Sequence, residues 1–145
     1  AQNARAMGAD ESDPVILGAK EIWHEAQNKI DYELDMIARV VYFEAGSSWL
    51  SQRHRELVAA VLINRCFDTR FPDTVEENIY RPGQYACAGR LYSVTREQIP
   101  DYCYSAAYNA AYGLVECPAG VIFQAQFKQG DSIYERHGNT YFCFG

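Results

Sequence analysis

Apolar residues recur every three or four positions through the first half of the chain, which is the spacing of amphipathic helices. This spacing predicts one helix over residues 14–29, with Trp23 in the core, and a second helix over residues 32–45. Asp31 is expected to cap the second helix, and Gly46 is expected to end it. The N-terminal third of the protein is therefore predicted to be helical.

Capping signals predict three further helices. Ser51 begins one of them, and its inward residues are Leu57, Val58, Val61 and Leu62. Thr74, followed three residues later by Glu77, forms a capping box before a short helix. Residues 95–116 are expected to form a longer helix with Pro100 in its first turn.

The composition becomes typical of β-strands after Pro118. The segments GVIFQAQF and SIYERHGNTYFCF are rich in β-branched and aromatic residues, with Gly138-Asn139 as the predicted hairpin turn. The expected fold class is therefore α+β, mainly α, with a small C-terminal β-hairpin or sheet. A chain of 145 residues has the length of one domain. We predict a single domain over residues 14–145, preceded by a flexible leader or linker remnant over residues 1–13.

One acidic residue, Glu44, falls where the second helix should be apolar. The apolar stripe of that helix comprises Leu34, Ile37, Ala38 and Val41, followed by Glu44 or Ala45. Because Glu44 follows Val41 by three residues and Ile37 by seven, it is expected on the buried face. Burial disfavours the ionised carboxylate and raises its pKa, and a protonated carboxyl beside a groove is what a glycosidase uses to protonate a leaving oxygen. The competing interpretation is that Glu44 turns outward at a frayed helix end, or pairs with Arg39 or Arg65.

Charge and cysteine content exclude several kinds of site. The net charge of −6 argues against nucleic acid as a partner, since phosphates attract a basic surface. The sequence has no apolar run of about 18 residues, so no membrane span is predicted. The five cysteines include no C-x-x-C pair, which gives no zinc signature and allows two disulfides at most. We predict no metal site and no cofactor.

Four segments, taken in order, resemble a known enzyme family. They are ARVVYFEAG, ELVAAVLINR, RFPDTVEENIYRPGQYAC and VIFQ…HGNTYF, and they extend from about Tyr32 to Phe144. Together they resemble the catalytic domain of spore cortex-lytic enzymes, the SleB/CwlJ-type cell-wall hydrolases of spore-forming bacteria. The resemblance implies a lysozyme-like fold of the kind found in lytic transglycosylases, and it maps the family's catalytic glutamate onto Glu44.

The activity implied by this resemblance is cleavage of the β-1,4 bond between N-acetylmuramic acid and N-acetylglucosamine in spore cortex peptidoglycan. A lytic transglycosylase would use Glu44 first as acid and then as base, giving a 1,6-anhydro-muramic end. A muramidase-type hydrolase would need a second carboxylate, for which the candidates are Glu56, Asp68, Asp73 and Asp131. The remaining alternatives are an N-acetylmuramoyl-L-alanine amidase and a non-catalytic peptidoglycan-binding domain.

Five further residues are predicted substrate contacts. Gln84 and Tyr85 belong to the P-G-Q-Y loop, and the Gln84 amide is expected to bond an acetamido group. Gln126 is expected to share one face of a strand with Gln124. Tyr141 is a candidate contact to a sugar or to developing charge, and Trp49, in the loop after Gly46, is a candidate stacking platform. The alternative for each of these side chains is packing or simple exposure to solvent.

The resemblance also implies partners and a location. The expected partners are peptidoglycan glycan strands and a regulatory protein in the spore, with no nucleic acid. The expected location is outside the cytoplasm, in the spore cortex or cell envelope.

Overall fold

A computed structural model describes residues 13–145 of the protein. The predicted leader, residues 1–13, lies outside this range except for Asp13. The chain divides into two compact units, residues 1–32 and residues 33–145. The described part of the first unit is helical. Its helix begins where the Asp13 carboxylate accepts a hydrogen bond from the Val15 backbone N–H at 2.8 Å, which satisfies one of the free donors of the first turn.

One continuous helix, α2 (Pro14–Ala45), replaces the two helices predicted before Gly46. The predicted cap at Asp31 is wrong, because its carboxylate instead accepts a hydrogen bond from Gln27 Nε2 at 3.1 Å, one turn earlier in the same helix. No glycine or proline interrupts the sequence at this point, so nothing forces the helix to stop. Trp23, expected in the core, is 59% exposed.

The next two helices begin at their predicted caps. The helix α3 (Gln52–Phe67) follows Ser51, whose hydroxyl accepts a hydrogen bond from the His54 backbone N–H. The helix α4 (Val75–Tyr80) follows Thr74, whose hydroxyl accepts one from the Glu77 backbone N–H. Both predictions are confirmed.

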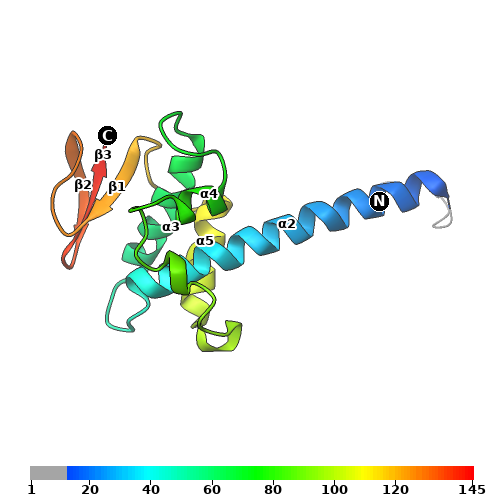
Figure 1. The fold of residues 1–145 in the computed structure, drawn as a ribbon, viewed down its shortest axis with the longest axis horizontal. Helices are drawn as coiled ribbons and strands as arrows, with labels where there is room; N and C mark the ends of the chain where they lie inside the picture. The colour runs from blue at the N-terminus through cyan, green and yellow to red at the C-terminus, as the bar shows by residue number, and fades with distance from the viewer. Residues whose placement is uncertain (1–12) are drawn as a thin grey trace. The chain divides into compact units, whose positions relative to one another are not determined.

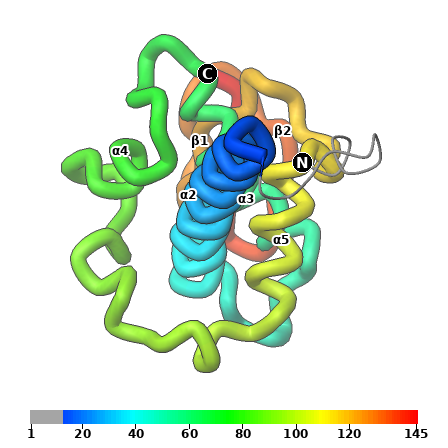
Figure 2. The backbone as a smooth tube through the Cα atoms, turned by 90° about the vertical axis from the view of Figure 1, so that its right-hand side faces the viewer, coloured from blue at the N-terminus to red at the C-terminus, as the bar shows by residue number. Residues whose placement is uncertain are grey.

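The predicted helix over residues 95–116 is shorter than expected. The connection after α4, green to yellow in Figure 2, contains two 3₁₀ turns, η1 (Ala88–Arg90) and η2 (Arg96–Gln98), before the helix α5 (Asp101–Ala111). Pro100 lies at the N-cap of α5 because a proline disfavours helical backbone in the residue before it, and Ile99 is extended. Beyond the other end of α5, Gly113 adopts a positive φ of 72°.

The chain ends in an antiparallel sheet of three strands, drawn from orange to red in Figure 1. The strands are β1 (Val121–Ala125), β2 (Ser132–His137) and β3 (Thr140–Phe144), and β3 lies between the other two. The predicted hairpin turn at Gly138-Asn139 joins β2 to β3 and is confirmed, with Gly138 at a φ of 57°.

The core of residues 33–145 combines the last turns of α2 with α3, α4, α5 and the sheet. Its buried residues include Val40, Val41, Leu57, Val61, Leu62, Ile79, Ala106, Ala107, Val121 and Phe142. The small alanines of α5 allow α3 and α5 to pack closely. Figure 1 shows the two helices next to each other. The fold is therefore mainly helical with a small sheet, as predicted from the sequence.

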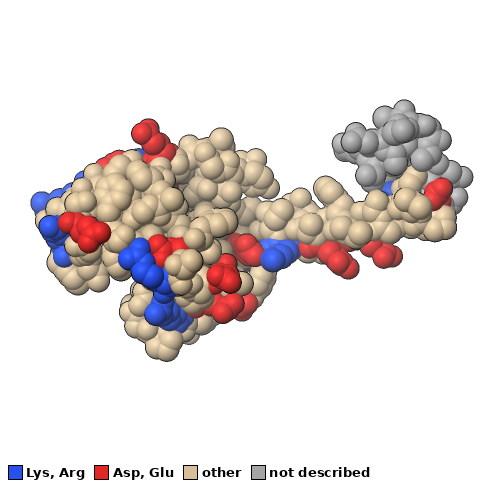
Figure 3. Space-filling model, turned by 90° about the horizontal axis from the view of Figure 1, so that it is seen from above, with Lys and Arg blue, Asp and Glu red and all other residues tan. Residues whose placement is uncertain are grey.

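The surface of the described residues carries both signs of charge. Figure 3 shows basic and acidic side chains interspersed on one face. Among the helices that the structure describes, none combines the length and the hydrophobicity that a bilayer span requires. All five cysteines are free thiols.

His54 is the one histidine buried in the core among the described residues. Its ring is packed edge-on against Phe142, with 5.6 Å between the ring centroids, and His137 lies 6.1 Å away. Neither ring nitrogen has a hydrogen-bond partner within the part of the chain described. Burial lowers the pKa of His54, and the nearby His137 and Arg55 lower it further.

Acidification is therefore expected to destabilise the fold through His54. The unfolded chain binds a proton at the ordinary histidine pKa of about 6.5, whereas the folded chain resists protonation, so the free energy of unfolding should fall as pH drops below about 6.5. Urea unfolding at several pH values measures this. His54→Leu should flatten the profile between about pH 7 and 5, while His24→Gln, at an exposed position, should leave it unchanged. An unchanged slope in His54→Leu would contradict the assignment.

Candidate active site

Glu44 lies in the last turn of α2, at the margin of the core. Ala45, beside it, is 1% exposed and takes the core position, whereas Glu44 itself is exposed. The expectation that Glu44 shares the buried face is therefore wrong in this respect. The spacing places Glu44 on the same side of the helix as Ile37 and Val41, which are buried. At the end of the helix this side is no longer covered by the core, so Glu44 is exposed.

The Glu44 carboxyl nevertheless has a shifted pKa. Partial burial raises the pKa from its ordinary value, and the positive charge of Arg90 lowers it to a smaller extent. Because Glu44 keeps access to solvent, this is the shift of a crowded carboxyl at the surface. Its charge in turn contributes to the raised pKa values of Tyr85, about 12, and Cys87, about 11, for which burial is the larger cause.

Arg55 and Tyr102 hold the end of α2. The Arg55 guanidinium, which is buried, donates from Nε to the Ala45 carbonyl oxygen at 2.9 Å and from Nη2 to that of Ser47 at 2.6 Å. The Tyr102 hydroxyl donates to the Gly46 carbonyl oxygen at 2.6 Å, and its ring centroid lies 3.8 Å from Arg55 Cζ. These bonds occupy carbonyl groups that helix formation leaves free at a C-terminus. They keep the turn that carries Glu44 in one conformation.

Gly46 allows the chain to leave the helix directly after this turn. A Cβ atom at this position would lie 2.2 Å from the Tyr42 carbonyl oxygen, so a larger residue does not fit without a backbone shift. The glycine predicted to end the helix has this role.

Arg39 attaches the connection between α4 and α5 to α2. Its Nη1 donates to the carbonyl oxygens of Leu91 at 3.1 Å and Val94 at 2.7 Å, and its Nε pairs with Asp35 at 2.8 Å. The same connection carries Tyr85 and Arg90 toward Glu44. The alternative in which Arg39 pairs with Glu44 is therefore wrong, because Asp35 takes this place.

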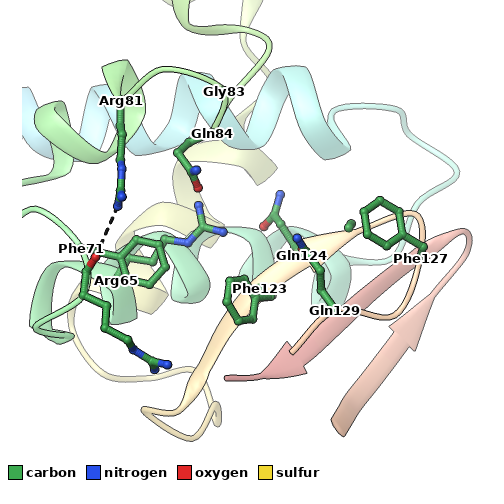
Figure 4. A pocket seen from close by; sticks show the side chains of 11 residues that line it. Arg65, Phe71, Arg81, Gly83, Gln84, Phe123, Gln124, Phe127 and Gln129 are labelled. Carbon is green, nitrogen blue, oxygen red and sulfur yellow. Dashed lines mark hydrogen bonds between the residues drawn. The ribbon is translucent and has the colours of Figure 1, made fainter. Parts of the chain in front are cut away.

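A pocket with a volume of about 460 Å³ lies between the P-G-Q-Y loop and β1 (Figure 4). Its polar lining consists of Arg65, Arg70, Arg81, Gln84, Gln124 and Gln129, and its apolar lining includes Phe71, Phe123 and Phe127. Arg65 is buried, and its Nε donates to the Ile122 carbonyl oxygen at 2.7 Å. The alternative in which Arg65 pairs with Glu44 is not seen, and the guanidinium instead lies near the rings of Phe71 and Tyr85.

The two predicted contacts of the P-G-Q-Y loop have different surroundings. Gln84 is exposed and lines the pocket. Tyr85 is 6% exposed, its ring centroid lies 5.4 Å from Arg65 Cζ, and its hydroxyl has no hydrogen-bond partner among the described residues. Tyr85 does not itself line the pocket, and the charge of Glu44 contributes to its raised pKa.

The strand prediction placed Gln124 and Gln126 on one face, and only the first is in a strand. Gln124 lies in β1 and lines the pocket, and its Oε1 is buried without a partner among the described residues. Gln126 lies beyond the end of β1 and is exposed, so the prediction that it shares a strand face with Gln124 is wrong. The strand is shorter than the alternation of residues suggests.

Trp49 and Tyr141 do not line this pocket. Trp49 is 83% exposed in the loop between α2 and α3. Tyr141 lies on β3, paired with Ala125 and stacked at 5.0 Å by Arg136. Both positions leave their proposed sugar contacts untested.

The candidate second carboxylates have other surroundings. Glu56 accepts a hydrogen bond from Asn109 at 2.9 Å, and Asp68 pairs with Arg70 at 2.9 Å. Asp73 and Asp131 are exposed. Within residues 13–145, no group of three or more His, Cys, Asp or Glu side chains is arranged to hold a metal ion.

Sequence reasoning missed Arg55 and Arg90 and expected a different role for Arg65. Arg55 holds the end of α2, Arg65 lines the pocket, and Arg90 acts on Glu44, although Arg65 was considered as an ion-pair partner. Arginine is usually exposed, so its identity alone gives no signal. The position of Arg55 and Arg65 ten residues apart on one helix, inside an apolar segment, was the available clue.

Comparison with known proteins gives one family and one fold. A family model described as Cell Wall Hydrolase matches residues 51–142, which is more than half of the chain. The solved catalytic domain of the Bacillus cereus SleB protein is similar in structure, with a TM-score of 0.63, 22% sequence identity, and coverage of 77% of this chain and 88% of that one. The catalytic domain of germination-specific lytic transglycosylase SleB from Bacillus anthracis is also similar in structure. Its TM-score is 0.61 and its sequence identity 23%, and the match covers 77% of this chain and 93% of that one. A search of curated proteins found no match.

Removing the charge of Arg90 should raise the pKa of Glu44 further. Arg90→Gln deletes the positive charge that stabilises the carboxylate, so deprotonation should require a higher pH. Titration of the Glu44 carboxyl carbon by NMR measures this directly. Arg96→Gln, which removes an exposed arginine from η2, serves as the matched control and should leave the midpoint in place. A midpoint that falls or stays constant in Arg90→Gln would rule out this interaction.

Proposed function

The chain belongs to the Cell Wall Hydrolase family and is an enzyme that acts on peptidoglycan, and from this premise we propose that it is a lytic transglycosylase. It cleaves the β-1,4 bond between N-acetylmuramic acid and N-acetylglucosamine. Glu44 is the catalytic residue. The family match begins at residue 51 and does not include Glu44. The support for Glu44 is therefore its position at the end of α2 and its raised pKa.

The proposed reaction uses one carboxyl group twice. The protonated Glu44 carboxyl donates its proton to the bridging oxygen, and the glycosidic C–O bond breaks with oxocarbenium character at muramic acid C1. The resulting carboxylate then accepts the proton of the same sugar's 6-hydroxyl as its oxygen bonds to C1. The product is a 1,6-anhydro ring, and no water is consumed.

The raised pKa of Glu44 is the observation that carries this proposal. A general acid must hold its proton near the working pH, and the crowding around this carboxyl favours the protonated form. The only ionic neighbour with a resolved effect on it, among the described residues, is Arg90. A raised pKa suits the general acid of a transglycosylase and of a hydrolase alike, so the reaction product distinguishes the two.

The biological setting is also part of the proposal. One structural neighbour is the catalytic domain of a germination-specific lytic transglycosylase, which supports action on spore cortex glycan outside the cytoplasm. A regulatory protein partner in the spore remains a prediction.

Replacing Glu44 with glutamine should abolish cleavage while leaving the fold intact. The amide has nearly the same shape as the carboxyl group but has no proton acidic enough to protonate the leaving oxygen. The rate should therefore drop by about 100-fold or more. Mass spectrometry of digested spore peptidoglycan measures both rate and chemistry. The wild-type protein should release 1,6-anhydro-muropeptides.

The matched control is Glu97→Gln, which changes an exposed glutamate of η2 and should leave the rate unchanged. Reducing muramic ends from the wild-type protein would indicate a hydrolase, and free stem peptides an amidase. Full activity of Glu44→Gln would remove Glu44 from the mechanism, and absence of all products would indicate a binding domain.

A further inference from the structure

The pocket beside the P-G-Q-Y loop has an excess of positive charge. Its lining includes three arginines and no aspartate or glutamate. Arg70 is neutralised by Asp68, to which it donates from two of its nitrogens at 3.0 and 2.9 Å. Among the described residues, no carboxylate is paired with Arg65 or Arg81. Two positive charges in this pocket therefore lack a counterion from the described chain.

The Arg65 guanidinium is held in place and leaves two nitrogens available. Its Nε is occupied by the Ile122 carbonyl oxygen at 2.7 Å, and the rings of Phe71 and Tyr85 lie 5.1 and 5.4 Å from Cζ. No hydrogen bond of the described chain uses its terminal nitrogens. Figure 4 shows this guanidinium in the pocket, with the Gln84 amide directed toward it. A fixed guanidinium with free terminal N–H groups is suited to a carboxylate.

Arg81 provides the second charge of the pocket. Its guanidinium lies 5.6 Å from the Phe71 ring, and its Nη1 donates weakly, at 3.4 Å, to the Arg70 carbonyl oxygen. Arg81 is exposed, so it can change direction when a ligand enters.

The remaining lining suits an amide-bearing ligand. Gln84, Gln124 and Gln129 present amide groups, and the buried Gln124 Oε1 lacks a donor among the described residues. Three phenylalanines line the same space and offer contacts for aliphatic groups. Carboxylate, amide and aliphatic groups together are the chemistry of a short peptide.

Tyr85 follows the pocket residue Gln84 in the P-G-Q-Y loop. Its ring lies against Arg65, and the charge of Glu44 acts on its hydroxyl. A glycan bound with its scissile oxygen at Glu44 is expected to extend a substituent toward this loop.

We propose that this pocket binds a carboxylate carried by the side chain of muramic acid, with Arg65 and Arg81 as its ligands. This inference rests on the proposed function and names the part of the substrate that is recognised. Two carboxylate sources exist on that sugar. One is the stem peptide, and the other is the lactyl group of a muramic acid from which the peptide has been removed.

Kinetics on two matched substrates test the proposal. The first is peptidoglycan with intact stem peptides, and the second is the same glycan after amidase treatment, which leaves the lactyl carboxylate. Arg81→Gln should lower kcat/KM about tenfold on a recognised substrate, mainly through KM, because one charge-assisted hydrogen bond is lost. Arg81→Lys keeps the charge without the fork and should recover part of the loss.

The pattern of loss identifies the carboxylate. A loss confined to the first substrate assigns the pocket to the stem peptide. A loss confined to the second assigns it to the lactyl carboxylate, which is free only after the amide bond has been cut, and a loss on both shows that the pocket accepts either carboxylate. Arg96→Gln, an exposed arginine away from the pocket that stacks on Tyr104 at 4.9 Å, should match the wild-type protein on both. Unchanged kinetics of Arg81→Gln on both substrates would overturn the proposal.

A binding experiment separates this inference from the proposed function. Calorimetry with the free tetrapeptide stem and the Glu44→Gln variant measures the pocket without any turnover. Under the stem-peptide assignment, the affinity should fall with salt and should be lost in the double variant with Arg81→Gln. Binding of the peptide by a protein that makes no anhydro product would refute the proposed reaction alone. Anhydro product without peptide binding or an Arg81 effect would refute the pocket alone.

Discussion

Buried guanidinium groups bound to backbone carbonyl oxygens hold the candidate site together. Arg39 binds the carbonyl oxygens of Leu91 and Val94, and Arg55 binds those of Ala45 and Ser47. Arg65 binds that of Ile122. Each arginine comes from a helix. Arg39 and Arg55 bind carbonyl groups that no helical hydrogen bond uses, and Arg65 binds one in the strand β1. Since an unpaired buried charge or carbonyl is costly, each contact restricts the segment to which it is attached.

These contacts explain how an exposed carboxyl can have a precise environment. Glu44 keeps access to solvent and substrate because α2 ends beside it, and Arg55 with Tyr102 prevents that end from fraying. Arg39 holds the opposite wall, which brings Tyr85 and Arg90 toward the carboxyl. The raised pKa then follows from partial desolvation by a fixed wall. Complete burial would give a larger penalty but would exclude the substrate.

The connection between α4 and α5 that carries Arg90 also carries the P-G-Q-Y loop beside the arginine-lined pocket. Arg65 is close enough to Tyr85 for their groups to stack, and Tyr85 is affected by the Glu44 charge. Arg90, which does act on Glu44, moves its pKa in the opposite direction to burial. The balance between these two effects determines how readily the carboxyl holds its proton.

Several local features were predictable because their causes are local. Ser51 and Thr74 cap helices through hydrogen bonds to residues three positions away, and Gly138-Asn139 forms a turn within a few residues. The same reasoning failed where two local signals competed. Asp31 has a capping side chain but no helix break beside it, and Pro100 ended a helical pattern that continued on both sides.

The sequence by itself determined the caps of α3 and α4, the hairpin turn, the glycine after Glu44, and the acidic residue at the end of the apolar row. Only the tertiary structure decided that this row leaves the core at Glu44, that Arg90 lies near its carboxyl, and that Arg65 and Arg81 share a pocket with Gln84. The physical reason is the range of the interactions involved. Caps and periodicity act over a few residues, whereas desolvation and charge depend on which distant segments are packed together.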